Sequence, residues 1–270
     1  MNFSVLMSIY CKENPEYFDR AMHSIWDEQT IQPNEIVLVQ DGRLTDELYQ
    51  SIDRWKEKLR GILKIVSLEE NVGLGNALNI GIKKCNNKLI ARMDTDDICS
   101  KDRFEKQLKV FEDIDIDICS SWVSEFDNDE AKIISYRKLP KNHNDIVNLS
   151  KKRSPINHPA VMYKKNIVQN SGGYKKMIWF EDYYLWARMI LKGAKFYNIQ
   201  ESLVNMRAGC GQLERRSGLK YAVNEFTLQR EFLNLGFINY FEFIRNVFIR
   251  YMVRILPKKL VKMIYKKLRN

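Results

Sequence analysis

The sequence predicts an α/β fold in which helices flank a mostly parallel central sheet. Short apolar runs typical of buried strands alternate with segments whose apolar residues recur at helical spacing, most clearly from residue 3 to residue 93. A content of 45% hydrophobic and 29% charged residues is that of an ordinary globular chain, which excludes wholesale disorder. The length of 270 residues suits two small domains, or one large α/β domain with an appendage.

Four apolar runs are predicted to form the first strands, with a helix between each pair. The strands are expected at residues 3–10, 35–40, 62–68 and 88–93. The helices are expected after Pro15, around the apolar positions Leu48, Ile52 and Trp55, and after Leu74. In such sheets ligands bind beyond the carboxyl ends of the strands. Asp41 and Asp94 each follow a predicted strand, and the loop from Tyr10 to Asn14 begins where the first strand ends, so we expect all three to face one crevice.

The second half of the chain is less regular and predicts a mixture of helices and short strands. One helix is expected around Phe104 and Leu108, and others near Glu181 and at residues 218–235. Strands are expected at residues 114–123, 132–137 and 160–163. The sequence contains no internal repeat and no low-complexity segment.

An acidic cluster follows directly after the strand predicted at 88–93. Asp94, Asp96 and Asp97 place three carboxylates within four positions, and such groups repel one another unless a cation lies among them. Mg²⁺ and Mn²⁺ prefer one or two carboxylates together with phosphate oxygens and water. The cluster therefore suits a metal–diphosphate, while the alternative is a solvated turn that caps the next helix.

A second acidic pair, Glu181 and Asp182, lies inside the aromatic run at residues 179–186. Apolar surroundings raise the pKa of a carboxyl group and suit it to accept a proton from a substrate. The alternative is a helix N-terminus, where Asp is favoured for its charge and its hydrogen-bond acceptors. Both interpretations can hold at once.

The turn from Asn71 to Asn76 contains Gly73 and Gly75 and opens a helix after a strand. Free backbone N–H groups in such a turn can receive a phosphate. The spacing differs from Gly-x-Gly-x-x-Gly, so the motif by itself is a weak indication of nucleotide binding.

Charge and cysteine content narrow the function classes. The formal net charge is +10, but residues 237–270 carry nine basic residues against Glu242 alone, so the rest of the chain is nearly neutral. A nearly neutral body disfavours nucleic-acid binding. The five cysteines are scattered without a Cys-x-x-Cys pair, which disfavours a zinc site or disulfide framework and favours a reducing cytoplasm. No run approaches the ~18 apolar residues of a membrane-spanning helix, and the N-terminus has no signal-peptide pattern.

The basic segment at 237–270 predicts two helical pieces divided at Pro257. Phe241, Ile244, Phe248 and Met252 recur at helical intervals between basic residues. Helices of this kind lie in the membrane interface and are attracted to anionic lipid. We therefore expect the segment to bind a membrane surface, and the alternative is a helix packed on the rest of the chain.

Taken in order, these motifs resemble those of a bacterial family 2 glycosyltransferase of the GT-A fold. The resemblance covers residues 3 to about 225. A single motif would be weak evidence, and the strength lies in the order in which the motifs occur. These parts are the strand at 3–10 with Glu13, Asn14 and Pro15 after it, the strand ending at Asp41, the block 71–81, the block 91–98 with Arg103 and Gln107, the segment at His158, and the block 181–186.

The resemblance implies an enzyme that transfers a hexose or an N-acetylhexosamine from a UDP-sugar with inversion. The acceptor would be a sugar on a lipid diphosphate, and the product a bacterial surface polysaccharide such as O-antigen. It implies a GT-A domain at 1–225, with a nucleotide-binding half at about 1–100 and an acceptor-binding half at about 101–225. Residues 226–270 would be the helical, basic membrane-surface segment, peripheral on the cytoplasmic face of the cell membrane.

The resemblance also implies donor-binding residues. Tyr10 would lie against the uracil, and Asp41 would hydrogen-bond the edge of that base. Arg215 and Arg216 form a basic loop of the kind found in the subgroup. They would close over the diphosphate, because guanidinium groups suit phosphate oxygens. These further nucleotide-sugar-binding residues are Asn71, Asn76, Arg92, Arg215 and Arg216.

Metal ligands and catalytic residues follow from the same resemblance. Asp94 would lie near the ribose and a Mn²⁺ or Mg²⁺ ion, and Asp96 would ligate that ion directly. Asp182 would be the general base, and Glu181 would contact the acceptor. His158 would touch the donor, the metal or the acceptor, unless it is a structural residue with its hydrogen bonds satisfied.

Two other functions remain open from the sequence. A sugar nucleotidyltransferase would have a Gly-rich loop with Arg or Lys after the first strand, where this chain has Cys11-Lys12-Glu13-Asn14-Pro15. A non-enzymatic, basic membrane- or nucleic-acid-binding protein would use the carboxylates structurally. Thermal stabilisation by UDP with Mn²⁺ would separate this last class from a glycosyltransferase.

Overall fold

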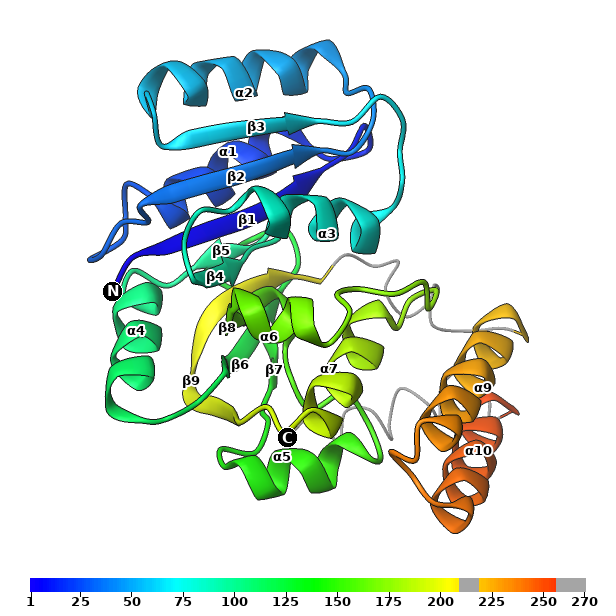
Figure 1. The fold of residues 1–270 in the computed structure, drawn as a ribbon. Helices are drawn as coiled ribbons and strands as arrows, with labels where there is room; N and C mark the ends of the chain where they lie inside the picture. The colour runs from blue at the N-terminus through cyan, green and yellow to red at the C-terminus, as the bar shows by residue number, and fades with distance from the viewer. Residues whose placement is uncertain (209–218, 256–270) are drawn as a thin grey trace.

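The computed structural model describes residues 1–208 and 219–255 (Figure 1). Its first half alternates strand and helix, as the sequence predicts. The elements are β1 (Phe3–Ile9), α1 (Pro15–Ile25), β2 (Glu35–Gln40), α2 (Asp46–Lys58), β3 (Leu63–Ser67), α3 (Leu74–Lys84) and β4 (Leu89–Arg92). The side chain of Asn14 accepts hydrogen bonds from the first turn of α1, and Pro15 occupies the first helical position, so this helix begins where the sequence places it.

The second half adds further strands to the same sheet and further helices around it. The elements are β5 (Ile98–Cys99), α4 (Arg103–Asp113), β6 (Ile118–Phe126), β7 (Ile133–Arg137), α5 (His143–Ser150), the 3₁₀ turn η1 (His158–Ala160), β8 (Met162–Lys164), α6 (Lys165–Asn170), α7 (Glu181–Leu191), β9 (Phe196–Arg207), α9 (Leu219–Asn234) and α10 (Tyr240–Ile255). The predicted strand at 114–123 is thus β6, which begins and ends later.

The strands form one curled sheet in the order β3-β2-β1-β4-β8-β6-β9-β5, with β7 paired to β6. The first four strands are parallel, as predicted. In the second half, β8 is antiparallel to both β4 and β6, whereas β6 and β9 are parallel. The α/β fold is therefore confirmed, with a parallel first half and a mixed second half.

Helices cover both faces of the parallel strands, and buried apolar side chains fill both layers. Phe18 of α1 and Leu48 of α2 pack on one face, and Leu78 of α3 and Leu185 of α7 pack on the other. A Cβ atom on Gly81 would lie 2.4 Å from the side chain of Leu6 in β1, so glycine lets α3 approach the sheet closely. The start of α3 is thereby fixed at the carboxyl edge of the sheet.

The 12-residue strand β9 is a long element that the sequence pattern does not predict. Its pairing with β6 shifts register around Trp122, which interrupts the alternation of inward and outward side chains. The strand also buries the polar residue Asn198, whose side chain donates to the carbonyl oxygens of Pro140 and Pro155 at 2.8 and 3.1 Å. A strand of this composition shows neither an apolar run nor a clean period of two.

Helices α9 and α10 form a pair beside α5 and α7 (Figure 1). The ring of Phe232 in α9 lies 4.9 Å from that of Tyr183 in α7. These helices confirm the helical predictions at 218–235 and in the first part of the basic segment. The proposed boundary at residue 225 falls inside α9. The second helical piece, after Pro257, and the predicted diphosphate residues Arg215 and Arg216 lie outside the described residues.

Candidate active site

A cavity of about 1190 Å³ begins at the carboxyl end of β4 and runs past α7 to α9 and α10. The sequence reasoning named several of the residues that line it, and they come from β4, the loop after it, η1 and the start of α7. The fold therefore joins motifs that lie far apart in the chain. These residues are Arg92, Asp94, His158, Glu181 and Asp182.

The carboxylates of the acidic loop after β4 have different environments. Both terminal nitrogens of the buried Arg92 guanidinium donate to the two carboxylate oxygens of Asp94. Burial and the charge of Asp94 raise the pKa of Asp96 to about 6. Asp97 is buried, its pKa is raised by burial and by its acidic neighbours, and it accepts a 2.9 Å hydrogen bond from the backbone N–H of Arg207. Asp97 therefore anchors the loop, while Asp94 lines the cavity.

Glu13 is a fourth carboxylate beside this loop, and the sequence reasoning did not give it a role. Burial, followed by the charges of Asp96 and Asp94, raises its pKa to about 7. It lies here because β1 and β4 are adjacent parallel strands whose following loops meet at one edge. That adjacency is the signal that could have identified it. Tyr10, in the same loop, is 37% exposed.

Arg207 ties the acidic loop to the second half of the sheet. Besides its backbone contact to Asp97, its Nε donates to the carbonyl oxygen of Asp96 at 3.3 Å. Its guanidinium carbon lies 3.7 Å from the centre of the Tyr17 ring. Arg207 ends β9, so its place beside the acidic loop could not be predicted without that strand. It brings a permanent positive charge next to the carboxylates.

The carboxylates of the acidic loop are the kind of ligand that a divalent cation prefers. In the described ranges 1–208 and 219–255, no three His, Cys, Asp or Glu side chains form a group able to hold a metal ion. The donor set instead fits an ion that takes one or two carboxylates and completes its shell with phosphate oxygens and water. Since Arg92 already engages Asp94, Asp96 is the better ligand. Burial is the main cause of the raised pKa values of Asp96 and Glu13, and their acidic neighbours add a repulsion that a cation would relieve.

Asp41 organises the glycine-bearing turn before α3. Its carboxylate accepts hydrogen bonds from the backbone N–H groups of Val72 and Gly73 at 2.7 and 3.1 Å. The side-chain amide of Asn71 donates to the Asp41 carbonyl oxygen at 3.2 Å, and that of Asn76 donates to the Val72 carbonyl oxygen at 2.9 Å. The backbone N–H groups of Val72 and Gly73, which were expected to be available to a phosphate, therefore already donate to Asp41. The assigned contact of Asp41 with the base stays a prediction.

His158 lies among aromatic rings where it lines the cavity. Its Nε2 shares a 2.8 Å hydrogen bond with the Tyr174 hydroxyl, and its ring centre lies 5.9 Å from that of Trp186. Burial, followed by the charge of Arg92, lowers its pKa well below the usual value, so the ring is neutral at pH 7. Because Tyr174 already engages Nε2, the geometry favours the structural interpretation of His158 over a metal ligand.

Glu181 and Asp182 form the first turn of α7, where the helix N-terminus favours negative charge. Burial raises the pKa of Glu181, and the neighbouring charge of Asp182 adds to the effect. Trp179, two residues before Glu181, has a φ of 69°, and its ring stacks on Tyr221 of α9 with 5.4 Å between ring centres. The turn into α7 is thus fixed by aromatic packing, and both carboxylates line the cavity.

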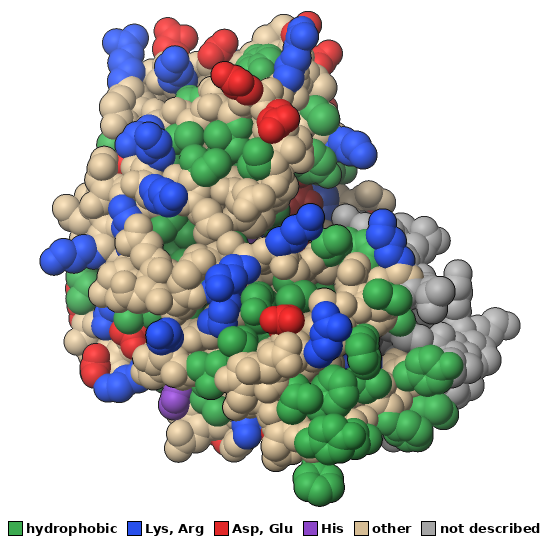
Figure 2. All heavy atoms as spheres, turned by 45° about the vertical axis from the view of Figure 1, so that its right-hand side comes forward, with side chains coloured by type: hydrophobic (Ala, Val, Ile, Leu, Met, Phe, Trp, Pro, Cys, Tyr) green, Lys and Arg blue, Asp and Glu red, His purple; other side chains and the backbone are tan. Residues whose placement is uncertain are grey.

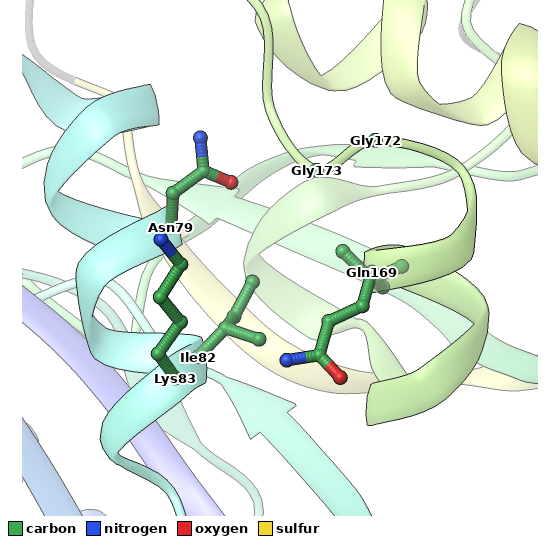
Figure 3. Close-up of a pocket in the computed structure, with 7 residues that line it drawn as sticks. Asn79, Ile82, Lys83, Gln169, Gly172 and Gly173 are labelled. Atoms are coloured by element: carbon green, nitrogen blue, oxygen red, sulfur yellow. The ribbon is translucent and has the colours of Figure 1, made fainter.

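Two polar side chains hold the loop that leads into α7. Asn79 of α3 donates to the carbonyl oxygen of Tyr174 and accepts from its N–H, both at 2.7 Å. Arg188 of α7 donates to the carbonyl oxygens of Ser171 and Gly173. Figure 3 shows Asn79 pointing toward Gly173 beside a smaller cavity of about 300 Å³ between α3 and α6. Among the described residues, no carboxylate lines that smaller cavity, so its importance lies in the clamp at its edge, the two hydrogen bonds between Asn79 and the Tyr174 backbone.

Two curated relatives match nearly the whole chain. The UDP-Gal:alpha-D-GlcNAc-diphosphoundecaprenol beta-1,3-galactosyltransferase of Escherichia coli is 41% identical over 266 residues, covering 98% of this chain and 95% of that protein. The amylovoran biosynthesis glycosyltransferase AmsE of Erwinia amylovora is 37% identical over 266 residues, covering 98% of each chain.

Solved structures share the fold at low sequence identity. TarS of S. aureus in complex with UDP-GlcNAc has a TM-score of 0.67 at 17% identity and covers 92% of this chain and 70% of that one. Mannosyltransferase PcManGT from Pyrobaculum calidifontis, in complex with GDP-Man and Mn²⁺, has a TM-score of 0.63 at 14% identity and covers 93% and 70%. These likenesses confirm the predicted GT-A fold. The family model for glycosyl transferase family 2 matches residues 4–172, and the chain belongs to that family.

Proposed function

We propose that this glycosyltransferase moves a hexose or an N-acetylhexosamine, with inversion, from a UDP-sugar to a sugar on a lipid diphosphate. The product would be part of a bacterial surface polysaccharide. The observation that carries the proposal is a single cavity lined both by Asp94 of the acidic loop and by Asp182 at the start of α7. A donor diphosphate at the first residue and an acceptor hydroxyl at the second would meet in that cavity.

The names of the relatives support this donor and acceptor. The E. coli relative is named for transfer of galactose from UDP-Gal to GlcNAc on diphosphoundecaprenol, and AmsE is named for amylovoran biosynthesis. Identities of 41% and 37% over 98% of this chain support the same kind of reaction here. UDP-galactose is therefore the first donor to test.

On the donor side, Asp96 and Asp94 would hold Mn²⁺ or Mg²⁺ together with the donor diphosphate. When bound, the ion supplies positive charge that offsets the negative charge developing on the departing UDP. Arg92 keeps Asp94 in place through two hydrogen bonds, and Asp97 fixes the loop to Arg207. These contacts preorganise the acidic loop before the donor binds.

On the acceptor side, Asp182 removes the proton from the acceptor hydroxyl as its oxygen attacks the anomeric carbon of the donor sugar. The new oxygen–carbon bond forms on the face opposite the diphosphate. The bond between the anomeric carbon and the diphosphate oxygen breaks, and UDP leaves with the electron pair. A single displacement with one base inverts the anomeric configuration, as in inverting glycosidases. Glu181 lies beside the base to contact the acceptor.

The surface of α10 supports action at a membrane surface. The polar side of the helix, with Asn246 and Arg250, hydrogen-bonds to the end of α5. The apolar side exposes Phe241, Phe248 and Tyr251 to 81%, 63% and 61%. Hydrophobic side chains accordingly gather at the lower right of Figure 2, over α9 and α10. An outward apolar stripe in a strongly basic segment suits the interface of anionic lipid.

In the described part of the chain, no helix combines the length and the apolar character that crossing a membrane requires.

Transfer assays with a panel of UDP-sugars and a sugar–diphosphate–polyprenol acceptor test the proposal. We expect UDP-galactose, an α-linked donor, to give a β-linked product, and we expect a chelator to abolish transfer until Mn²⁺ is restored. An α-linked product would contradict the single displacement. Undiminished transfer in chelator would contradict the roles of Asp94 and Asp96. Absence of product from every UDP-sugar would contradict the proposed function itself.

A further inference from the structure

Beyond the carboxylates of α7, the candidate active-site cavity continues into a basic end. This basic end is formed by Lys152 and Arg153, which follow α5, and by Arg245 and Arg250 of α10. The same cavity is lined by Asp94 and Asp182, and at the basic end by one carboxylate, Glu225, against the four cations. The basic end has no part in the donor chemistry proposed above.

Two of the four cations are built into the fold. Arg250 forms an ion pair with the buried Glu225 and donates to the carbonyl oxygen of Lys152 at 2.6 Å. Arg245 donates to the side-chain oxygen of Asn246 at 2.9 Å. The Arg250 contact fixes α10 against the turn after α5 and holds that turn at the cavity, whereas the Arg245 contact lies within α10.

Lys152 and Arg153 are exposed, and neither side chain forms a hydrogen bond or ion pair with another residue in the described part of the chain. The side chains of Lys152 and Arg153 are not needed to satisfy the carbonyl groups at the end of α5. The carbonyl oxygens of residues 150, 151 and 152 accept hydrogen bonds from Tyr183, Asn246 and Arg250. Two adjacent cations beside two arginines repel one another, and an anion among them removes that repulsion. Guanidinium and ammonium groups together suit the oxygens of a diphosphate.

Exposed apolar side chains of α10 adjoin the basic end. Ile249 lines the cavity next to Arg250 and is 53% exposed, and Phe248 and Met252 continue the apolar surface at 63% and 44% exposure. The order from Asp182 outward is thus a catalytic carboxylate, a group of cations and a hydrocarbon-like surface. A sugar, a diphosphate and a polyprenyl chain follow one another in the same order in a lipid-linked acceptor.

We propose that the basic end binds the diphosphate of the polyprenyl-linked acceptor and that the polyprenyl chain leaves along α10. Lys152 and Arg153 supply the unpaired charges, and Arg245 and Arg250 complete the site. The identification of the ligand as an acceptor rests on the proposed function. Its diphosphate chemistry rests on the cavity and the charges alone.

Binding of farnesyl diphosphate to the full chain, measured by calorimetry in detergent, tests the proposal without requiring turnover. The variant Lys152→Ala/Arg153→Ala removes both exposed charges and leaves the partners of the α5 carbonyl groups in place. We expect its affinity for farnesyl diphosphate to fall about tenfold or more, as for lost charge-assisted hydrogen bonds. Its affinity for UDP with Mn²⁺ should not change. A matched control, Lys56→Ala/Arg60→Ala near the end of α2, removes two exposed charges far from the cavity and should bind as the wild type does.

Several results would overturn the proposal. One is equal affinity of the wild type and the Lys152→Ala/Arg153→Ala variant for farnesyl diphosphate, or no binding by the wild type. Another is a parallel loss of UDP affinity, which would assign the basic end to the donor. A third is a loss confined to phosphatidylglycerol vesicles, which would assign it to bulk lipid head groups. Failure of sugar transfer with normal farnesyl diphosphate binding would contradict the proposed function and leave this site standing.

Discussion

At the scale of single residues, the proposed chemistry depends on how Asp182 differs from the other carboxylates. Asp182 lies in the first turn of α7, where the helix N-terminus favours the ionised form that a base requires. Asp94 is held by Arg92, and Asp97 is buried against Arg207. We therefore propose that Asp182, which lines the cavity from the first turn of α7, accepts the proton of the acceptor hydroxyl.

Replacement of Asp182 by Asn is expected to lower kcat by about 10²–10⁴-fold, the usual contribution of a general base. Affinity for UDP with Mn²⁺ should stay at the wild-type value, because the change lies outside the acidic loop. Steady-state kinetics and UDP titration measure the two effects. Asp53→Asn, the same change at an exposed site on α2, serves as the control. A kcat within a few-fold of the wild type would remove Asp182 from the role of base.

Glu13 gives a prediction on pH. Burial and the charges of Asp96 and Asp94 raise its pKa from 4.5 to about 7, so the folded chain holds this proton more tightly than the unfolded chain. Its contribution to stability is then fully present below pH 4.5 and is lost as the pH rises through about 7.

Urea unfolding in chelator at pH 5 and pH 8 checks the sign. We expect the wild type to lose more unfolding free energy between these pH values than the Glu13→Gln variant loses. Glu16→Gln, an exposed carboxylate three positions along, should behave as the wild type does. Identical pH dependence in Glu13→Gln and wild type would contradict the proximity of Glu13 to the acidic loop.

At the scale of elements, the contact between α3 and the loop before α7 sets the position of the first turn of α7, which carries Glu181 and Asp182. The motif around Asn79 was recognisable in the sequence, but its partner was not, because Tyr174 lies in an irregular loop with no periodic signal. The two hydrogen bonds between Asn79 and the Tyr174 backbone join α3 to the loop before α7. Tyr174 in turn holds His158.

Asn79→Ala is expected to lower the unfolding free energy by about 1–3 kcal/mol, because two backbone groups lose their partner. It should also lower kcat while UDP affinity changes little, since the loop that precedes α7 and positions Asp182 is released. Chemical denaturation and kinetics test both effects. Asn148→Ala, the same change at an exposed helical site on α5, is the matched control, because its side chain makes no hydrogen bond within the described residues. Equal losses of unfolding free energy and of kcat in both variants would show that the hydrogen bonds of Asn79 do not position the start of α7.

Helix α10 turns its polar side inward and its apolar side outward, and this carries a second prediction at the element scale. Phe241→Ser/Phe248→Ser should weaken co-sedimentation with anionic vesicles by about tenfold or more, because roughly 1.5 kcal/mol or more of burial is lost per side chain. The melting temperature should change little, since both rings are exposed. Ile134→Ser/Tyr136→Ser removes exposed apolar side chains from β7 and controls for general hydrophobicity. Undiminished vesicle binding by the α10 variant would contradict the membrane role of this helix.

At the scale of the whole molecule, the sequence predicted the α/β fold, the order of the first seven elements and the motifs that line the cavity. The parallel half was readable because each of its strands is an apolar run and each helix has an apolar stripe. β9 was not, because it buries polar groups such as Asn198 and shifts register against β6. The places of Glu13 and Arg207 beside the acidic loop depend on which strands are neighbours, and the basic end depends on how α10 packs on α5. Such long-range pairings leave no local pattern.

The central claim is that one cavity joins a metal–diphosphate site at the acidic loop to a base on α7. A crystal structure of the protein with UDP and Mn²⁺ tests it most directly. The account predicts the ion within bonding distance of the Asp96 carboxylate and of the diphosphate oxygens, with Asp182 facing the side where the sugar attaches. An ion bound away from Asp96, or Asp182 directed away from the diphosphate, would contradict it.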